Sequence, residues 1–237
     1  MDTTDIAALG LFLACWLGYE PLLRRVSHPA GALNTNMVVI RRAWMDNMSG
    51  RDNKFFDSQL MGHTLTSASF FASSNLLLIA ALTGALVGGD RTWQSLHALP
   101  LVDRTAPHLF ELKLALVIAA MARSLLDFIW SIRQMNYCLA AMGAAPTGAS
   151  AEVTKAYGEA AADILNPALS SFNAGVRGYY FALAAGAWLL GPEAFSVVTL
   201  GAVGLLVWRQ SASRAAKGIR TLRRLIEDQG IDEAGSD

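Results

Sequence analysis

The stretch Ala122 to Cys138, ARSLLDFIWSIRQMNYC, places Arg123, Asp127 and Arg133 at the end of a long apolar run. Arg123 and Asp127 are four residues apart, a spacing at which two side chains of a helix meet, so we expect them to form an ion pair. Arginine also binds phosphate and carboxylate groups well. The same charges could therefore hold an anionic solute or an anionic lipid headgroup.

Polar side chains in two other segments could join these charges. The segments HTLTSASFFASSN and SSFNAGVRGYYF each open an apolar run with polar residues, and charged groups within such runs usually face other helices or an aqueous cavity. We expect the arginines near helix ends to be accessible to a ligand and Arg123, which lies deeper, to be structurally sensitive. The predicted binding cluster consists of Arg123, Asp127, Arg133, Gln134, Arg177, Ser67, Ser74 and Asn173.

Motifs for catalysis are absent from the sequence. It holds no phosphate-binding glycine loop with lysine, no HExxH, no GxSxG and no two carboxylates close together within an apolar run. Cys15 and Cys138 lie in or beside apolar runs without CxxC spacing, so we interpret them as small hydrophobic side chains. We predict no catalytic residue, no metal site and no cofactor.

The elements that carry these residues are predicted to be membrane helices. Hydrophobic residues make up 53% of the chain and charged residues 16%, against about 25% charged in an ordinary soluble domain. About 20 apolar residues cross the hydrocarbon core as a helix. The sequence therefore predicts an all-α integral membrane bundle in a single domain, 1–226, followed by an acidic disordered tail, 227–237. The five predicted spans are 6–23, 65–87, 110–131, 172–190 and 194–208.

The distribution of positive charge predicts the orientation of these spans. Lysine and arginine are concentrated between the first and second spans and after the last, whereas the loop from Gly88 to Leu109 is balanced in charge. Loops rich in lysine and arginine remain cytoplasmic. The N-terminus should then lie outside and the C-terminus inside, with Gly191–Pro192 as a hairpin turn between the last two spans. The formal net charge of zero gives no indication of a nucleic-acid partner.

Two amphipathic segments, Met37 to Met48 and Ala212 to Ile226, are predicted to lie on the cytoplasmic membrane surface. Each has apolar residues at helical spacing beside basic ones. A basic residue near an anionic lipid surface contributes about 1 kcal/mol to binding, although the same charges could serve only to orient the chain. The predicted lipid-surface residues are Arg41, Arg42, Trp44, Arg220, Arg223 and Arg224.

Small residues at four-residue spacing predict where helices approach closely, since they let two backbones come together. One such set lies in the second predicted span and another in the fourth. The two sets are Ala80, Gly84 and Gly88, and Gly178, Ala182 and Gly186.

Several strings resemble domain of unknown function family 599, a group of bacterial and plant multi-pass membrane proteins. The strings are NTNMVVIRRAWM, SFFASSNLLLI, WSIRQMNYC with GAAP, and RGYYFALAAGAWLLGPEAF, and the resemblance extends from about Tyr19 to Arg214. It implies a multi-pass protein, with a bacterial inner membrane as its location. It implies no activity and no functional residues.

Two functional hypotheses remain open. One is a small transport protein, or a protein that binds an anion or anionic lipid through the polar cluster. The other is a structural or accessory membrane protein that binds a partner or a second copy of itself. A cavity reaching Arg123 and Asp127 would favour the first, whereas a closed network of hydrogen bonds would favour the second. In both, the chain contacts the lipid bilayer.

Overall fold

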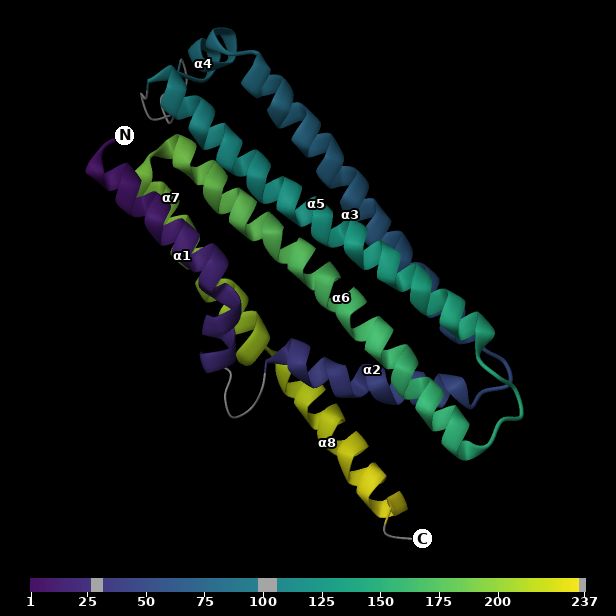
Figure 1. The fold of residues 1–237 in the computed structure, drawn as a ribbon. Coiled ribbons are helices and arrows are strands. Elements are labelled where there is room, and N and C mark those ends of the chain that lie inside the picture. Colours follow the sequence, from purple (N-terminus) through teal and green to yellow (C-terminus); the bar gives the residue numbers. More distant parts are fainter. Residues whose placement is uncertain (27–31, 98–105, 235–237) are drawn as a thin grey trace. The chain divides into compact units, whose positions relative to one another are not determined.

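The computed structural model describes residues 1–26, 32–97 and 106–234, which are helical almost throughout (Figure 1). No strand occurs within these ranges, as the predicted all-α class requires. The elements are α1 (Thr3–Val26), α2 (Leu33–Ser49), α3 (Phe55–Val87), α4 (Asp90–His97), α5 (Pro107–Ala144), α6 (Ala151–Ala187), the 3-10 helix η1 (Trp188–Leu190), α7 (Pro192–Ser211) and α8 (Arg214–Ala234).

Three segments of the described chain are long and apolar enough to cross a membrane. They are Thr3–Leu23, Phe55–Val87 and Pro192–Asp228, and they contain the predicted spans 6–23, 65–87 and 194–208. The other two predicted spans, 110–131 and 172–190, lie within or at the end of α5 and α6, whose apolar runs are interrupted by charged residues. These two spans stay predictions.

Helices α3, α5 and α6 are longer than the sequence predicted. They contain 33, 38 and 37 residues, which at 1.5 Å per residue corresponds to roughly 50 Å or more. The hydrocarbon core of a bilayer is only ~30 Å thick. Each helix therefore extends beyond the length that crosses a membrane. A search for long apolar runs does not detect this additional portion.

The described chain forms two compact units. Unit 1 comprises Met1–Leu23, Phe71–Asp127 and Ala174–Leu206, and unit 2 comprises Arg24–Phe70, Phe128–Asn173 and Val207–Asp237. This division is finer than the single domain predicted over 1–226. Helices α3, α5 and α6 each contribute one portion to unit 1 and the other to unit 2.

Aromatic side chains form much of the core of unit 1. Phe12 of α1 contacts Phe181 of α6 edge-on and Phe195 of α7 at a tilt, with ring centroids 6.1 and 5.1 Å apart. Trp188 stacks on Phe195 at 5.0 Å, and Tyr19 contacts Phe181 edge-on at 6.3 Å. Such pairs stabilise packing beyond the area they bury, so they fix α1 and α7 against α6.

A buried polar cluster lies near the starts of α1 and α5 and the end of α6. The indole Nε1 of Trp188 donates a hydrogen bond of 2.9 Å to Asp5 Oδ1, and Lys113 Nζ lies 5.8 Å from the Trp188 ring centroid. Asp5 and Lys113 are both buried. The interactions bring together residues from α1, α5 and η1 and hold these helix ends on one side of unit 1.

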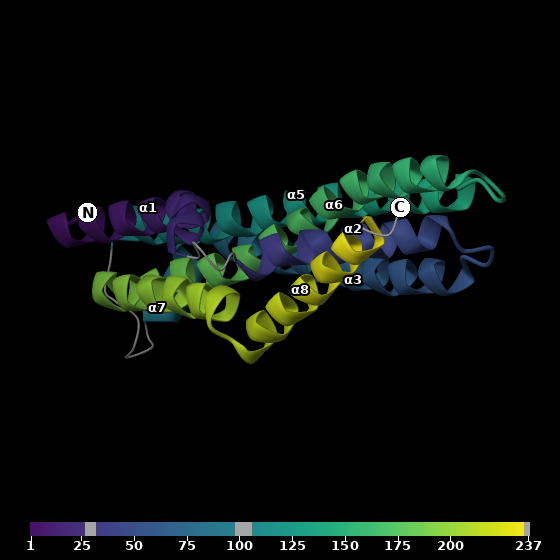
Figure 2. The same ribbon diagram turned by 90° about the horizontal axis from the view of Figure 1, so that it is seen from below.

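The chain reverses between α6 and α7, as the predicted hairpin requires. Gly191 has φ of 117°, a conformation that glycine adopts without strain, and Pro192 begins α7, a position that proline favours. In Figures 1 and 2, α6 and α7 run in opposite directions from this turn.

Methionine and alanine form the core of unit 2. The buried residues come from α2, α3, α5 and α6, and α8 contacts α2 beside this core through Arg223, which donates a 2.9 Å hydrogen bond to Asn36 Oδ1 (Figure 2). Helix α8 extends to Ala234, so residues 227–234 are helical where the sequence predicts the disordered tail, and 235–237 lie outside the described residues. The buried core residues include Met45, Met48, Met61, Met135, Met142, Ala161, Ala162, Leu165 and Ala168.

Candidate functional site

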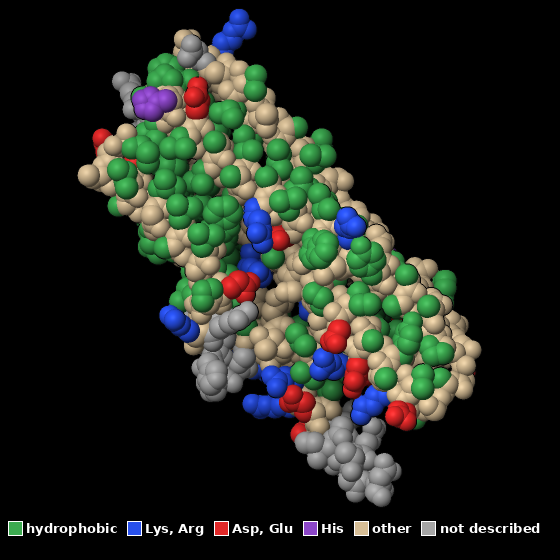
Figure 3. Space-filling view, viewed as in Figure 1, with side chains coloured by type: hydrophobic (Ala, Val, Ile, Leu, Met, Phe, Trp, Pro, Cys, Tyr) green, Lys and Arg blue, Asp and Glu red, His purple; other side chains and the backbone are tan. Residues whose placement is uncertain are grey.

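A pocket of about 360 Å³ lies within unit 1, where side chains of α1, α5 and α6 converge. Two arginines and two carboxylates line it together with aromatic rings, and Figure 3 shows basic and acidic side chains in a recess among hydrophobic ones. Charged groups usually avoid such apolar surroundings unless they are paired or bind something. The lining includes Trp16, Tyr19, Glu20, Arg123, Asp127 and Arg177.

The predicted pair of α5 is formed. Arg123 Nε and NH2 donate hydrogen bonds of 3.2 Å to the two carboxylate oxygens of Asp127, a geometry that holds the guanidinium and the carboxylate in one plane. The Arg123 side chain is 65% exposed, whereas that of Asp127 is 19% exposed. Asp127 therefore anchors the pair, and Arg123 presents its guanidinium to the pocket.

A second ion pair in the pocket was not predicted from the sequence. Arg177 of α6 contacts the carboxylate of Glu20 on α1, 157 positions away in the sequence. The Arg177 guanidinium also lies 5.4 Å from the ring centroid of Tyr19, a cation–π arrangement. Here Arg177 is the anchored partner, with 13% of its side chain exposed against 53% for Glu20. No spacing rule connects such distant positions.

Tyr19 contributes an unsatisfied polar atom to the site. The residue is 2% exposed, and its hydroxyl group is buried without a hydrogen-bond partner. A buried hydroxyl left unpaired costs about 1–3 kcal/mol. The hydroxyl is therefore an unsatisfied group behind the pocket wall, and it has no partner among the described residues.

Close contact between α5 and α6 fixes both arginines. Ser124, next to Arg123, donates its hydroxyl to the Gly175 carbonyl, and a Cβ placed on Gly178, next to Arg177, would lie 2.6 Å from Ser124 Cβ. The prediction of close approach is therefore confirmed at Gly178. It is wrong at Gly84 and Gly186, where a Cβ placed on the glycine would have no atom of another described element within 4 Å.

Four residues of the predicted binding cluster belong to unit 2 and do not line the pocket. Arg133 is exposed and contacts the Tyr137 hydroxyl at 3.3 Å, and Asn173 donates to Asn34 at 2.7 Å. Ser67 donates to a carbonyl of its own helix, and Gln134 has a buried oxygen without a partner. Ser74 lies in unit 1 outside the pocket lining. The structure thus brings together Arg123, Asp127 and Arg177 of the predicted set.

The expectation that arginines near helix ends are accessible holds for Arg133, which is exposed. It is wrong for Arg177, whose side chain is mostly buried. The reason is the unpredicted partner Glu20, which with Tyr19 covers the Arg177 guanidinium. The depth of Arg123 in the membrane stays a prediction.

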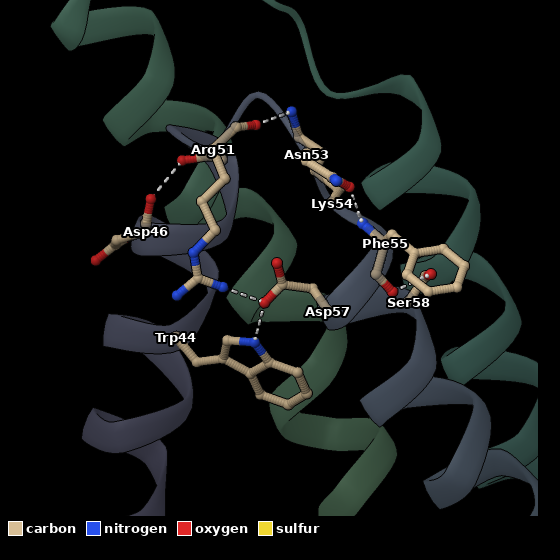
Figure 4. Close-up of polar contacts among 9 residues, drawn as sticks. Trp44, Asp46, Arg51, Asn53, Lys54, Phe55, Asp57 and Ser58 are labelled. Carbon is tan, nitrogen blue, oxygen red and sulfur yellow. Dashed lines mark hydrogen bonds and ion pairs between the residues drawn. The ribbon is translucent and has the colours of Figure 1, made fainter.

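A second polar centre occupies the connection between α2 and α3 in unit 2 (Figure 4). Asp57 is fully buried and accepts hydrogen bonds on Oδ1 from Trp44 Nε1, at 2.7 Å, and from Arg51. Its Oδ2 atom is buried without a hydrogen-bond partner. All three residues are close in sequence, and the centre closes the turn between the two helices, so it is a structural clamp.

Most predicted lipid-surface residues make contacts inside unit 2. Arg41 is buried rather than exposed, and this burial lowers its pKa to about 10. Trp44 and Arg223 donate the hydrogen bonds described above. Arg42 pairs with Asp163 at 3.2 Å, and Arg220 donates to the Ser211 carbonyl at 2.9 Å. Arg42 is nevertheless exposed, and so is Arg224 on α8, close to the exposed Leu222 and Leu225.

Asp46 of α2 lies near the clamp and is electrostatically unusual. Burial raises the pKa of its carboxyl group, and the negative charge of Glu159 raises it further, against the lowering effect of Arg42 and Lys155. Its Oδ1 atom is buried without a hydrogen-bond partner. Among the described residues, no group of three or more histidine, cysteine or acidic side chains could hold a metal ion.

Comparison with protein families finds a match over residues 7–215, and the family is described as a protein of unknown function, DUF599. No curated protein and no solved structure matches the chain.

Proposed function

The chain belongs to the DUF599 family, and we propose that it is a multi-pass membrane protein that binds a small anionic group in the pocket of unit 1. The group belongs to a solute, which the protein would transport, or to the headgroup of a lipid. The observation that carries the proposal is the pocket of about 360 Å³ that reaches Arg123 and Asp127. A space beside the charges favours a binding role over a closed network of hydrogen bonds.

The proposed topology has five spans, with the start of α1 outside and α8 in the cytoplasm. Unit 1 takes in the portions of α1, α3, α5, α6 and α7 that correspond to the predicted spans. The Asp5–Trp188–Lys113 contacts support this arrangement, since they join three helix ends that the topology places on the outer side.

The distribution of basic residues supports the same orientation. Of the 19 lysines and arginines, all but five belong to the sequence segments of unit 2. Basic segments remain on the cytoplasmic side of a membrane. In a bacterium, the membrane that borders the cytoplasm is the inner membrane. The five in the segments of unit 1 are Arg91, Arg104, Lys113, Arg123 and Arg177.

The pocket would then open in the cytoplasmic leaflet. Glu20, Asp127 and Arg177 each lie within about one helical turn of a point where the chain passes from unit 1 to unit 2. A ligand would reach Arg123 first, because its guanidinium is the exposed cation of the pocket. Anionic lipid would also contact α8, where Arg224 lies close to the exposed Leu222 and Leu225.

One observation favours a second candidate, a structural or accessory membrane protein. Each of the four charged side chains in the pocket has an oppositely charged partner within the chain. Paired in this way, the charges could specify helix packing, and the protein would act through a partner or a second copy of itself.

Binding in nanodiscs separates the two candidates. We expect the wild-type protein to gain thermal stability in phosphatidylglycerol over an uncharged glycolipid, or on addition of inorganic phosphate. Arg123→Gln should abolish the phosphate effect, because loss of a charge-assisted hydrogen bond costs about 1.5–3 kcal/mol, roughly ten- to hundredfold in affinity. Arg133→Gln is the matched control, since Arg133 lies on the same helix in unit 2 and does not line the pocket.

Equal stability in both lipids, with no effect of phosphate, would reject anion binding and leave the structural candidate. Equal losses in Arg123→Gln and Arg133→Gln would show that the effect is one of overall charge. Either result overturns the assignment to this pocket.

A further inference from the structure

We propose that the ligand of the unit 1 pocket carries a cationic amine as well as its anionic group, so that the site selects a zwitterion. This inference rests on the proposed function and names its ligand class. The chemistry is an ammonium group a short distance from a phosphate or carboxylate, as in a free amino-phosphate or amino acid, or in the headgroup of an aminophospholipid.

The charge of the lining is balanced, which disfavours a simple anion. Two arginines face two carboxylates in the pocket. An anion without a cation would approach Arg123 while also meeting the exposed carboxylate of Glu20. Discrimination against a ligand commonly uses such an opposing charge. A ligand that also carries an ammonium group turns this repulsion into a second ion pair.

The two pairs expose opposite charges. In the α5 pair the guanidinium of Arg123 is 65% exposed and its partner carboxylate 19%, whereas in the α1–α6 pair the carboxylate of Glu20 is 53% exposed and its partner guanidinium 13%. The pocket therefore offers one accessible cation and one accessible anion. Asp127 and Arg177 are the buried members, and they position the two accessible groups.

Aromatic side chains complete a site for such a ligand. Trp16 lines the pocket one turn from Glu20 on α1, and an ammonium group is attracted to an indole face. Tyr19, which is almost completely buried, lines the same pocket. The Tyr19 ring lies against the Arg177 guanidinium and keeps it beside Glu20, so that the carboxylate of Glu20 remains the accessible member of this pair.

Titration of the detergent-purified protein with three probes tests the inference. Phosphoethanolamine carries both charges, inorganic phosphate lacks the ammonium group, and ethanolamine lacks the phosphate. We expect phosphoethanolamine to bind at least tenfold more tightly than either of the others. Glu20→Gln should remove this preference while phosphate binding survives, and Arg123→Gln should weaken both phosphate and phosphoethanolamine.

Glu193→Gln is the matched control, because Glu193 is an exposed carboxylate of unit 1 that lies outside the pocket. It should keep the tenfold preference. Glu20→Asp, which keeps the charge, is expected to retain part of the preference. This result would show that the loss in Glu20→Gln is due to the missing charge and not to any change at this position of α1.

The outcomes distinguish failure of the zwitterion inference from failure of the proposed anion binding. If phosphate binds as tightly as phosphoethanolamine, or if Glu20→Gln keeps the preference, the zwitterion inference is wrong and anion binding stands. If none of the probes binds, and nanodiscs of phosphatidylethanolamine and phosphatidylglycerol stabilise the protein no more than nanodiscs of an uncharged glycolipid, the proposed function itself fails. Greater stability in phosphatidylethanolamine without binding of free phosphoethanolamine, abolished by Glu20→Gln, would support the inference and identify a lipid headgroup as the source.

Discussion

At the scale of residues, the two ion pairs of the pocket should differ in strength. Arg123 and Asp127 belong to one helix and the guanidinium is mostly exposed, so their coupling should be about 0.2–0.5 kcal/mol. Arg177 is mostly buried and also contacts Tyr19, so its coupling to Glu20 should be larger, about 1–2 kcal/mol. Double-mutant cycles with glutamine and asparagine, followed by unfolding in detergent, measure both. Equal coupling energies would show that the burial of Arg177 does not strengthen its pair with Glu20.

A second prediction at this scale concerns Asp46 and pH. Because its pKa is raised in the folded protein, the folded state holds the proton more tightly than the unfolded state. Stability contributed by this group is therefore present at acidic pH and is lost as the pH rises through the raised pKa. Asp46→Asn should raise the melting temperature at neutral pH and flatten its decline between acidic and neutral pH.

Asp163→Asn is the control for this prediction. Asp163 is 72% exposed and pairs with Arg42 at the surface, so its replacement should leave the pH profile of stability nearly unchanged. A profile that responds equally to both substitutions would show that the pH dependence arises from net charge rather than from burial of Asp46.

The sequence predicted the residue contacts that are local and missed those that are not. Arg123 and Asp127 were predicted to pair because their spacing on a helix decides it. Glu20 was not identified as a partner of Arg177, since its role depends on how α1 packs against α6. The burial of Arg41 was missed for a similar reason, because the same pattern of apolar and basic residues suits a helix on a lipid surface and a helix on a protein core.

At the scale of elements, the contact between α5 and α6 depends on Gly178. A methyl group there would overlap Ser124, so Gly178→Ala should lower the stability by about 1–3 kcal/mol and also disturb the pocket. Gly186→Ala lies on the same helix with open space around it and should be neutral or slightly stabilising, since alanine favours helix by up to about 1 kcal/mol. Melting temperatures in detergent compare the two. If both variants behave alike, helix propensity rather than contact governs this face.

Small-residue spacing alone could not tell these two glycines apart. Both belong to the same four-residue pattern, and only the position of α5 decides which one is covered. The sequence also did not predict where these helices end. The portions of α3, α5 and α6 in unit 2 are less apolar than a span and bury only one face.

At the scale of the whole molecule, the five-span topology makes a labelling prediction. In a variant without Cys15 and Cys138, single cysteines at Ser95 and Glu193 should react with an impermeant thiol reagent on intact cells, because both positions are exposed and the topology places them outside. Cysteines at Asp52 and Lys217 should react only after the cells are opened. These two are exposed positions of unit 2.

The choice of cytoplasmic positions matters for this test. Ser49 is buried and its hydroxyl lies within hydrogen-bond distance of the carbonyls of Asp46 and Thr154, so a cysteine there would fail to react on either side. Labelling of Glu193 and Lys217 from the same side would contradict the hairpin at Gly191–Pro192. The sequence predicted the class of fold and this turn from composition and charge, but the division into two units follows from contacts that no hydropathy profile contains.

The methionine core of unit 2 makes this part of the chain sensitive to oxidation whenever it opens. Five of the eight methionines, Met45, Met48, Met61, Met135 and Met142, are almost completely buried there. Peroxide converts methionine to a polar sulfoxide only where it reaches the sulfur, and the product no longer fits an apolar core. Each oxidation therefore records an opening of unit 2 and makes the next opening easier, so damage in this unit is self-reinforcing.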